Sequence, residues 1–274
     1  MLVEVCVDSL QSAIDAEKGG AHRLELCASL ELGGLTPTTG LLKAVKSRVK
    51  IPVFCMIRPR SGDFVYNRAD VEVMAEDILC LALSDGFVFG ALTKPLECDG
   101  STERLVDMET CLKLIQAADG KPCTFHRAFD LVEDKEIALA SLNSLGFKRI
   151  LTTGGGKNVG ESINQLCLMH HQRSMHRNID DNQDIIILPG GGVNSEIAML
   201  LKTEGFTEIH SSGSMVIKEE GYGADFNKLP AAGTRVVCSE DKIRLLVDTV
   251  TGKIEVNYHI QGDLSAQVTV VKDF

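Results

Sequence analysis

The feature that most constrains the fold is a regular alternation of short strand-like runs with helical patterns, repeated eight times along the chain. The strand-like runs begin near residues 2, 23, 52, 86, 122, 149, 185 and 208. Units in this order predict a parallel sheet, because parallel strands need long crossover connections. Eight of them favour an α/β fold closed into a (β/α)8 barrel of the TIM type. An open doubly wound sheet, which would leave two edge strands, is the alternative.

The repeat also predicts how the chain is divided. Residues 1–252 are predicted to form a single barrel domain, since α/β barrels of about 250 residues fold as one domain. The polar stretch 176–183 is predicted to be a solvated insertion before the seventh strand. The tail 253–274 alternates apolar and polar residues, which indicates a C-terminal extension that could form a hairpin. Packing on the barrel and a role in association both stay open for this tail.

Composition and charge exclude several classes of function. The 274 residues carry a net charge of −10, so the chain lacks the basic face that a nucleic-acid site needs. No apolar run approaches the length of a membrane-spanning helix, and the first residues do not resemble a signal peptide. Nine cysteines without a C-x-x-C pair indicate reduced thiols. We therefore expect a cytoplasmic protein that binds neither nucleic acid nor a membrane.

Polar side chains occupy one face of several strands that should be buried. Side chains alternate between the two faces of a strand, so runs such as Val3-Glu4-Val5-Cys6-Val7 have one aliphatic and one polar face. Buried polar groups are costly unless they meet partners, so we expect the polar faces to converge inside the barrel. These faces carry Glu4, Cys6, Asp8, Glu25, Cys27, Arg58, Thr124, His126, Glu208 and His210.

Four of these residues are candidate catalytic groups, namely Glu25, Arg58, His126 and His210. Active sites of this fold lie at the carboxyl ends of the strands, where these residues are predicted. A carboxylate and imidazoles near an arginine suit proton transfer on an anionic substrate. The alternative is a structural network of buried ion pairs, for instance Glu4 or Glu25 with Arg58.

Glycines after the seventh strand suggest an anion site. Gly190, Gly191 and Gly192 follow this strand directly. Glycines let several backbone N–H groups approach an anion, and the loops after strands 7 and 8 commonly hold phosphate in such barrels. A tight turn that merely needs glycine conformations is the alternative.

Two cysteines suggest a metal site. If the first two strands are neighbours, Cys6 and Cys27 project to the same face and could approach each other. Paired thiolates select a soft cation such as Cu(I) over Mg²⁺ or Ca²⁺. Two buried thiols without a metal are the alternative from residue chemistry alone.

A series of motifs, in order along the chain, resembles the CutC copper homeostasis family. The motifs are Glu4-Val5-Cys6, Arg23-Leu24-Glu25-Leu26-Cys27, Met56-Ile57-Arg58-Pro59-Arg60, Thr124-Phe125-His126-Arg127 and Pro189-Gly190-Gly191-Gly192, and the resemblance runs from Val3 to about Gly213. It implies a (β/α)8 barrel, copper handling in the cytosol, and a homo-oligomer, either a dimer or a tetramer. It also implies Cu(I) binding at Cys6 and Cys27. With a cysteine at position 6 the chain resembles the eukaryotic branch of the family, since many bacterial members lack a cysteine at this position.

The sequence therefore predicts a cytosolic copper homeostasis protein that binds Cu(I) through paired thiolates at the C-terminal face of the barrel. The alternative is an enzyme that acts on a small anionic or phosphorylated metabolite in the same cavity. Whether any substrate is turned over stays open.

Overall fold

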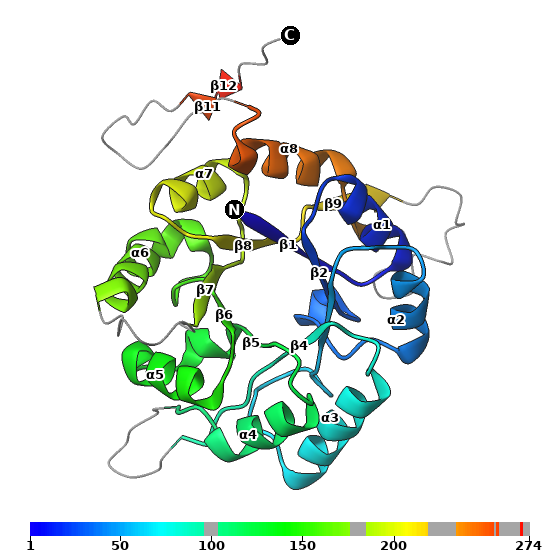
Figure 1. Ribbon diagram of the computed structural model, residues 1–274, viewed down its shortest axis with the longest axis vertical. Helices are drawn as coiled ribbons and strands as arrows, with labels where there is room; N and C mark the ends of the chain where they lie inside the picture. Colours follow the sequence, from blue (N-terminus) through cyan, green and yellow to red (C-terminus); the bar gives the residue numbers. More distant parts are fainter. Residues whose placement is uncertain (96–103, 176–184, 219–233, 255, 258–268, 271–274) are drawn as a thin grey trace.

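The structure is a computed structural model that describes residues 1–95, 104–175, 185–218, 234–254, 256–257 and 269–270. The predicted insertion at 176–183 lies outside these residues. Eight parallel strands form an inner ring (Figure 1), namely β1 Leu2–Val7, β2 Arg23–Leu26, β3 Val53–Met56, β4 Gly86–Phe89, β5 Cys123–Phe125, β6 Arg149–Thr152, β7 Ile186–Pro189 and β8 Glu208–Ser211. They follow the order β7-β6-β5-β4-β3-β2-β1-β8, and a parallel bridge between Gly190 and His210 joins the two ends. The predicted (β/α)8 barrel is confirmed.

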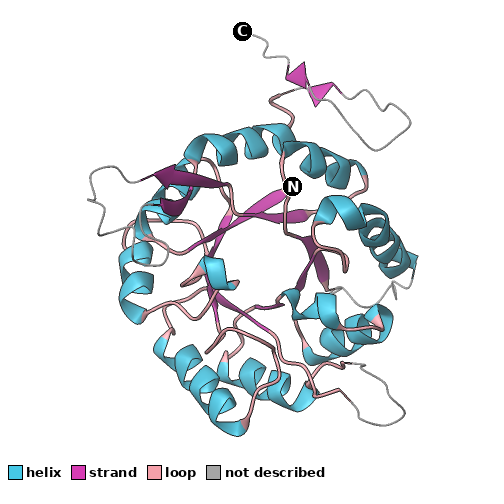
Figure 2. Ribbon diagram, turned by 180° about the vertical axis from the view of Figure 1, so that it is seen from behind, coloured by secondary structure: helices cyan, strands magenta, loops and turns pink. Residues whose placement is uncertain are grey.

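Helices surround the strand ring on its outside (Figure 2). They are α1 Leu10–Lys18, α2 Thr39–Lys46, α3 Arg68–Cys80, α4 Met108–Ala117, α5 Lys135–Leu145, α6 Val159–Met175, α7 Ser195–Thr203 and α8 Glu240–Thr251. Local sequence fixes where many of them begin, because a polar side chain before the helix accepts a backbone N–H from its first turn. Ser9 does so for α1, Asn67 for α3 and Asn194 for α7.

The two faces of the strands separate as the alternation predicts. Val3, Val5 and Val7 are buried in the large apolar cluster that also contains the inward faces of the helices. Phe54 and Met56 belong instead to a small separate cluster in the barrel interior, which includes Cys27 and Val88. The polar members of the strands share that interior, so the aliphatic faces build the core between strands and helices.

Two further strand pairs lie outside the barrel. β9 Ser214–Lys218 and β10 Thr234–Cys238 form an antiparallel pair that the sequence analysis missed. Both strands are largely exposed, so they have no buried face whose pattern could predict them. In the tail, β11 Val256–Asn257 pairs with β12 Thr269–Val270, also antiparallel. Among the described helices, none has the length and apolar character needed to cross a membrane.

Candidate functional site

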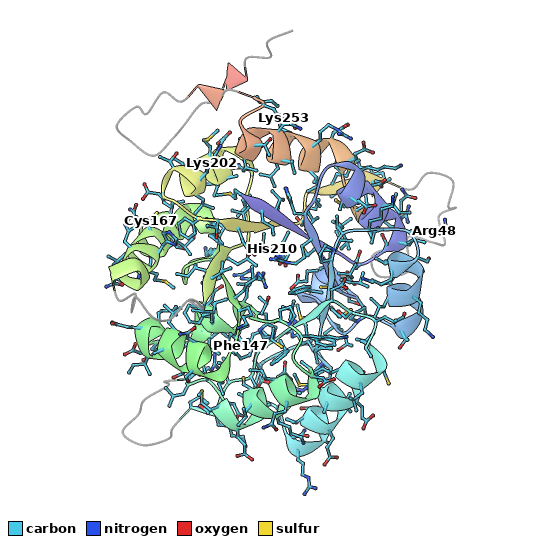
Figure 3. All side chains as sticks on the ribbon, in the orientation of Figure 1. Arg48, Phe147, Cys167, Lys202, His210 and Lys253 are labelled. Carbon is cyan, nitrogen blue, oxygen red and sulfur yellow. The ribbon has the colours of Figure 1, made fainter. Side chains whose placement is uncertain are left out.

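A cavity of about 250 Å³ lies at the carboxyl ends of the barrel strands. It brings together nearly all residues that the sequence predicted for the site. Its lining includes Cys6, Glu25, Cys27, Phe64, His126, Arg127, Gly190, Gly191, Gly192 and His210. Figure 3 shows His210 in the middle of the ring, whereas Arg48, Lys202 and Lys253 lie on the outside. Of the candidate catalytic, glycine and thiol residues, Arg58 alone is not part of the lining, and Asp8, directly after β1, is not part of it either.

Three side chains from neighbouring strands form a group with the spacing of metal ligands. Cys6 of β1, Glu25 of β2 and His210 of β8 each offer one ligand atom, and these atoms all lie within 4.8 Å of one another. The strand register explains the grouping, because Cys6 pairs with Glu25, and His210 pairs with Glu4 two residues earlier on β1. In the part of the chain that the structure describes, this is the one such group of three or more Cys, His, Asp or Glu. Cys27 lines the same cavity but is not a member.

Glu4 fixes the orientation of the His210 ring. The Nδ1 atom of His210 lies 2.8 Å from Oε1 of Glu4, and its Nε2 atom lies 3.7 Å from Oε2 of Glu25. Burial alone would lower the pKa of His210, but its interactions with Cys6 and Glu25 and the hydrogen bond to Glu4 raise it well above its ordinary value. A histidine whose Nδ1–H is donated to a carboxylate has its Nε2 directed to the opposite side. Here that side is the cavity with Cys6 and Glu25.

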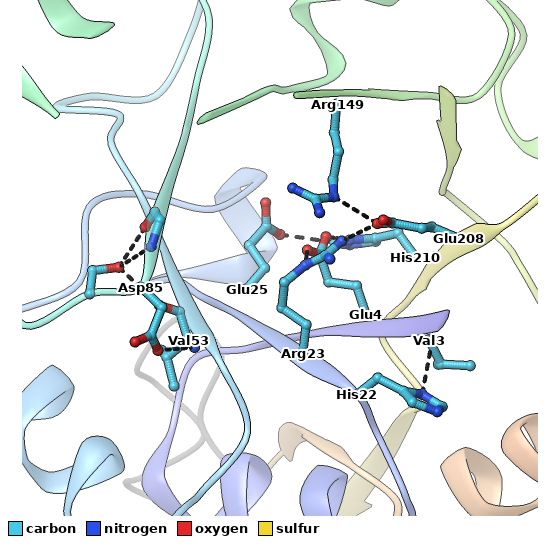
Figure 4. A network of polar contacts seen from close by, with 12 residues as sticks. Val3, Glu4, His22, Arg23, Glu25, Val53, Asp85, Arg149, Glu208 and His210 are labelled. Atoms are coloured by element: carbon cyan, nitrogen blue, oxygen red, sulfur yellow. Dashed lines mark hydrogen bonds and ion pairs between the residues drawn. The ribbon is translucent and has the colours of Figure 1, made fainter. Parts of the chain in front are cut away.

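Beneath the cavity, a buried ion network continues from Glu4 (Figure 4). Arg23 contacts Glu4 through Nε and donates from Nη2 to Glu208 at 2.6 Å, and Arg149 donates to Glu208 at 2.7 Å. Burial would raise the pKa of Glu4, but the charge of Arg23 and the contacts with His210 lower it to about 2. The buried network weighed as an alternative therefore exists, with Arg23 and Arg149 as its cations in place of Arg58.

The sequence analysis did not single out these two arginines, although a signal was available. Arg23 is two residues before Glu25 on β2, so strand alternation places it on the same inward face. Each arginine is the first residue of its strand, at the end of the barrel opposite the cavity. Both guanidinium groups lie over the ring of Phe54, with their carbon atoms 5.1 Å and 5.5 Å from the ring centre.

Glu25 is a buried carboxyl group with unused hydrogen-bonding capacity. Burial raises its pKa to about 7, and the charge of Glu4 adds to the effect while His210 opposes it. Its Oε1 atom is buried without a hydrogen-bond partner among the residues described. Glu25 can therefore take up or release a proton near neutral pH.

Arg58 has a structural task next to the cavity. Its guanidinium donates to the carbonyl oxygens of Leu32 and Gly62, each at 2.9 Å, and of Gly34 at 3.3 Å. It also stacks on Phe64, with 4.8 Å between the guanidinium carbon and the ring centre. These contacts tie together the loops after β2 and β3. The arginine that lines the cavity is Arg127, which the sequence analysis had assigned no role at the site.

His126 follows β5 and is neutral. Burial, and then the charge of Arg58, lower its pKa to about 3. Its Nδ1 accepts a hydrogen bond from the backbone N–H of Ala128 at 3.3 Å, which leaves the proton of the neutral ring on Nε2. Gly90 makes room for the ring, since a Cβ there would lie 2.7 Å from Nδ1 of His126. Its Nε2 is buried and has no partner in the described chain.

The three glycines after β7 differ in their tasks. Gly190 donates its N–H to the carbonyl of Thr152 and lies close against β8, because a Cβ would lie 2.9 Å from Cβ of His210. Gly191 and Gly192 have φ angles of +104° and +78°, in the region that favours glycine. Within the described residues, no acceptor is recorded for either N–H. Of the three glycines, Gly191 and Gly192 can therefore offer their N–H groups to an anion, whereas Gly190 cannot.

Comparison with known proteins agrees with this architecture. A family model described as the CutC family matches residues 1–215. The chain belongs to the CutC family. The human copper homeostasis protein cutC homolog is 41% identical over 248 residues, which span 89% of this chain and 84% of the human one. The mouse homolog is 45% identical and covers 77% of this chain and 73% of its own length.

Solved structures give the same assignment. A CutC structure from Streptococcus agalactiae superposes with a TM-score of 0.67 at 32% identity and covers 77% of this chain and 98% of its own. The thiamine phosphate pyrophosphorylase of Pyrococcus furiosus, at 11% identity and a TM-score of 0.52, shares the fold alone. All cavity residues of this CutC chain lie within the matched residues 1–215, whereas β10 and α8 lie beyond them.

Proposed function

We propose that this CutC protein binds Cu(I) as its cargo at Cys6 and His210, with Glu25 beside them, as part of copper homeostasis. The observation that carries the proposal is the convergence of these three donors within 4.8 Å of one another. The family supports copper as the ion, because the human and mouse relatives are named copper homeostasis proteins.

The spacing and chemistry of the donors fit one ion. Metal–sulfur and metal–nitrogen bonds of about 2.3 Å and 2.0 Å separate two donors on opposite sides of an ion by about 4.3 Å. Donor atoms within 4.8 Å therefore need only a small adjustment. Thiolate and imidazole suit Cu(I), whereas a carboxylate prefers harder cations. Glu25 is then best placed to accept a proton that Cys6 or His210 must lose on binding.

Glu4 and Cys27 have supporting parts in this proposal. Glu4 holds the His210 ring through Nδ1, and this contact points Nε2 at the ion. Cys27 was predicted as the second thiolate and lines the same cavity. Burial, followed by the charge of Glu25, raises the pKa of its thiol well above the ordinary value. Cys27 can therefore bind the ion as a thiolate only after losing a proton, and its raised pKa disfavours that loss.

Anaerobic titration with Cu(I) under competition from a chromophoric chelator tests the proposal. We expect Cys6→Ser and His210→Asn each to weaken the affinity at least tenfold. Cys27→Ser decides whether the second thiolate takes part. Cys80→Ser is the matched control, because Cys80 is an exposed free thiol at the end of α3, outside the cavity lining. Equal affinity and stoichiometry in wild type and Cys6→Ser would refute the proposal.

We also propose that the protein works in the cytoplasm as a homo-oligomer. The eight cysteines in the described chain are all free, as expected in a reducing compartment. Val73, Leu79 and Leu83, on or just after α3, are at least half exposed, and an apolar surface of this kind suits association. Light scattering of the full chain tests the oligomer, and a monomer at micromolar concentration would contradict it.

A second candidate function is an enzyme that acts on a small anionic metabolite in the same cavity. The specific observation in its favour is Glu25, a buried carboxyl group with a pKa of about 7 and an unpartnered oxygen. Such a group can transfer a proton at neutral pH. For any substrate found by screening, Glu25→Gln should abolish turnover while binding persists, and retained turnover would contradict this role.

A further inference from the structure

We propose that the mouth of the cavity binds a small oxyanion, the carboxylate or phosphate group of a metabolite. Its binding groups are the His126 ring, the Arg127 guanidinium and the backbone N–H groups of Gly191 and Gly192. The sequence predicted an anion near these glycines with Arg58 as the cation, but the terminal nitrogens of Arg58 donate to loop carbonyls and the residue is not part of the cavity lining. This site is distinct from the proposed Cu(I) ligands and does not depend on copper.

His126 supplies a buried donor that lacks an acceptor. The residue is only 3% exposed, lines the cavity, and has no partner at Nε2 within the described chain. Because Nδ1 accepts the N–H of Ala128, the neutral ring carries its proton on Nε2. A buried donor without an acceptor is unfavourable, and nearly all such groups in native proteins are satisfied. An oxygen atom of a ligand would supply the acceptor here.

Arg127 supplies a cation whose position is fixed by a contact with Asp130. Its Nε donates to Oδ2 of Asp130 at 3.0 Å. Asp130 is itself fixed by the backbone N–H of Thr153, at 3.1 Å from Oδ1. The terminal nitrogens of Arg127 have no hydrogen bond within the described residues, and its side chain lines the cavity and is 47% exposed. A guanidinium with its two terminal nitrogens free matches a carboxylate or phosphate in a bidentate contact.

The backbone of the loop after β7 completes the site. A Cβ built on Gly191 would lie 3.6 Å from Nη1 of Arg127, so the guanidinium and this loop are adjacent. The same Cβ would lie 2.8 Å from Cγ2 of Thr153, so no larger residue fits without a shift. Because Gly191 and Gly192 have no side chain, an anion can approach their backbone N–H groups closely. The position after strand 7 is also one where barrels of this fold hold phosphate.

The rest of the cavity limits the kind of metabolite. A volume of about 250 Å³ is below the usual range for drug-sized ligands, so the ligand is small. The acidic group of Glu25 and the thiol of Cys6 also line the cavity and disfavour a second negative group. We therefore expect a metabolite with one anionic end at Arg127 and a neutral or cationic remainder.

Isothermal titration calorimetry on the copper-free, reduced full chain tests the site. Inorganic phosphate is the probe in one arm and lactate in the other, in a buffer without other oxyanions. We expect saturable binding of at least one probe by wild type, and the arm that binds identifies phosphate or carboxylate as the source. Arg127→Gln and His126→Phe should each weaken binding at least tenfold. Arg68→Gln is the matched control and should bind as wild type, because Arg68 is an exposed arginine on α3 that pairs with Glu72 and is not part of the cavity lining.

Two results would overturn the proposal. One is the absence of saturable binding in both arms, and the other is unchanged affinity in Arg127→Gln. If His126→Phe fails to fold, ¹⁵N NMR of wild-type protein with labelled histidine replaces it. The Nε2 signal of His126 should then shift on anion addition, and an unchanged signal counts against the site. Because copper is absent throughout, failure of Cu(I) binding at Cys6 would not affect the outcome.

Discussion

Replacing Arg23 with methionine tests the buried ion network under the cavity. Arg23 is the cation between Glu4 and Glu208, and all three side chains are less than a tenth exposed. Methionine keeps much of the apolar contact with Phe54 but removes the charge. Glu208 retains Arg149 as a partner, whereas Glu4 keeps only His210 among the residues that the structure describes. The free energy of unfolding should therefore fall mainly through Glu4.

The magnitude follows from the pKa of Glu4, which is about 2 in the fold and 4.5 ordinarily. A lowered folded pKa gives stability that is fully present above pH 4.5 and is lost as the pH falls through 2. The difference corresponds to about 3 kcal/mol at pH 7, and it is the net effect of Arg23 and His210 acting against burial. Breaking a buried ion pair by removing one partner typically costs about 3–5 kcal/mol, which agrees. We expect Arg23→Met to lose about 3 kcal/mol at pH 7 and clearly less at pH 4, where Glu4 without Arg23 can hold a proton.

Urea unfolding of copper-free protein at both pH values measures the loss. Arg68→Met is the control, since the exposed pair of Arg68 with Glu72 should contribute less than about 1 kcal/mol. Adding Glu4→Gln to Arg23→Met should restore part of the stability at pH 7. The reasoning is refuted if Arg23→Met lies within about 1 kcal/mol of wild type at pH 7, or if its loss is the same at pH 4.

Three further predictions concern the cavity itself. Because the pKa of Glu25 is raised to about 7, the wild type loses stability as the pH rises from 4.5 through 7. Glu25→Gln should therefore be more stable than wild type by about 3 kcal/mol at pH 8 and similar to it near pH 4.5. If the free energies of unfolding in urea of the two proteins changed with pH in parallel, this would be contradicted. His126, with a pKa of about 3, should show only the neutral Nε2–H form by ¹⁵N NMR down to about pH 4, and an imidazolium signal near pH 6 would count against its burial. Gly190→Ala should lower the free energy of unfolding, measured in urea, by about 1–3 kcal/mol, because the added Cβ would lie 2.5 Å from Cδ1 of Leu151. Unchanged stability would show that the strands can move apart there.

The division of the strands into two faces was predictable from the chain alone. Val3, Val5 and Val7 alternate with Glu4 and Cys6, and this period of two fixes opposite directions for the two sets. A parallel sheet buried on both sides then leaves the polar set only the barrel interior. The structure bears this out, with the valines in the core that faces the helices.

The partners within the interior were not predictable in the same way. Cys6 and Cys27 were expected as a pair and both line the cavity, but the group of three donors within 4.8 Å joins Cys6 to Glu25 and His210, from the two strands that flank β1. Residues that share a face can meet in many combinations, and the stagger between strands selects among them. Likewise, Arg58 and Arg127 both follow strands, but the loop carbonyls engage Arg58 and leave Arg127 at the cavity.

The order and period of its residues determined that this chain closes into a barrel with acids, thiols and imidazoles inside. Those properties depend on neighbours in sequence, because alternation and strand–helix spacing act over a few residues. Only the tertiary structure decided that His210 meets Glu4 and Cys6 across 206 and 204 residues of chain, and that Glu4 is held by Arg23. Such contacts depend on the register and stagger of strands that are distant in sequence, which no local pattern encodes.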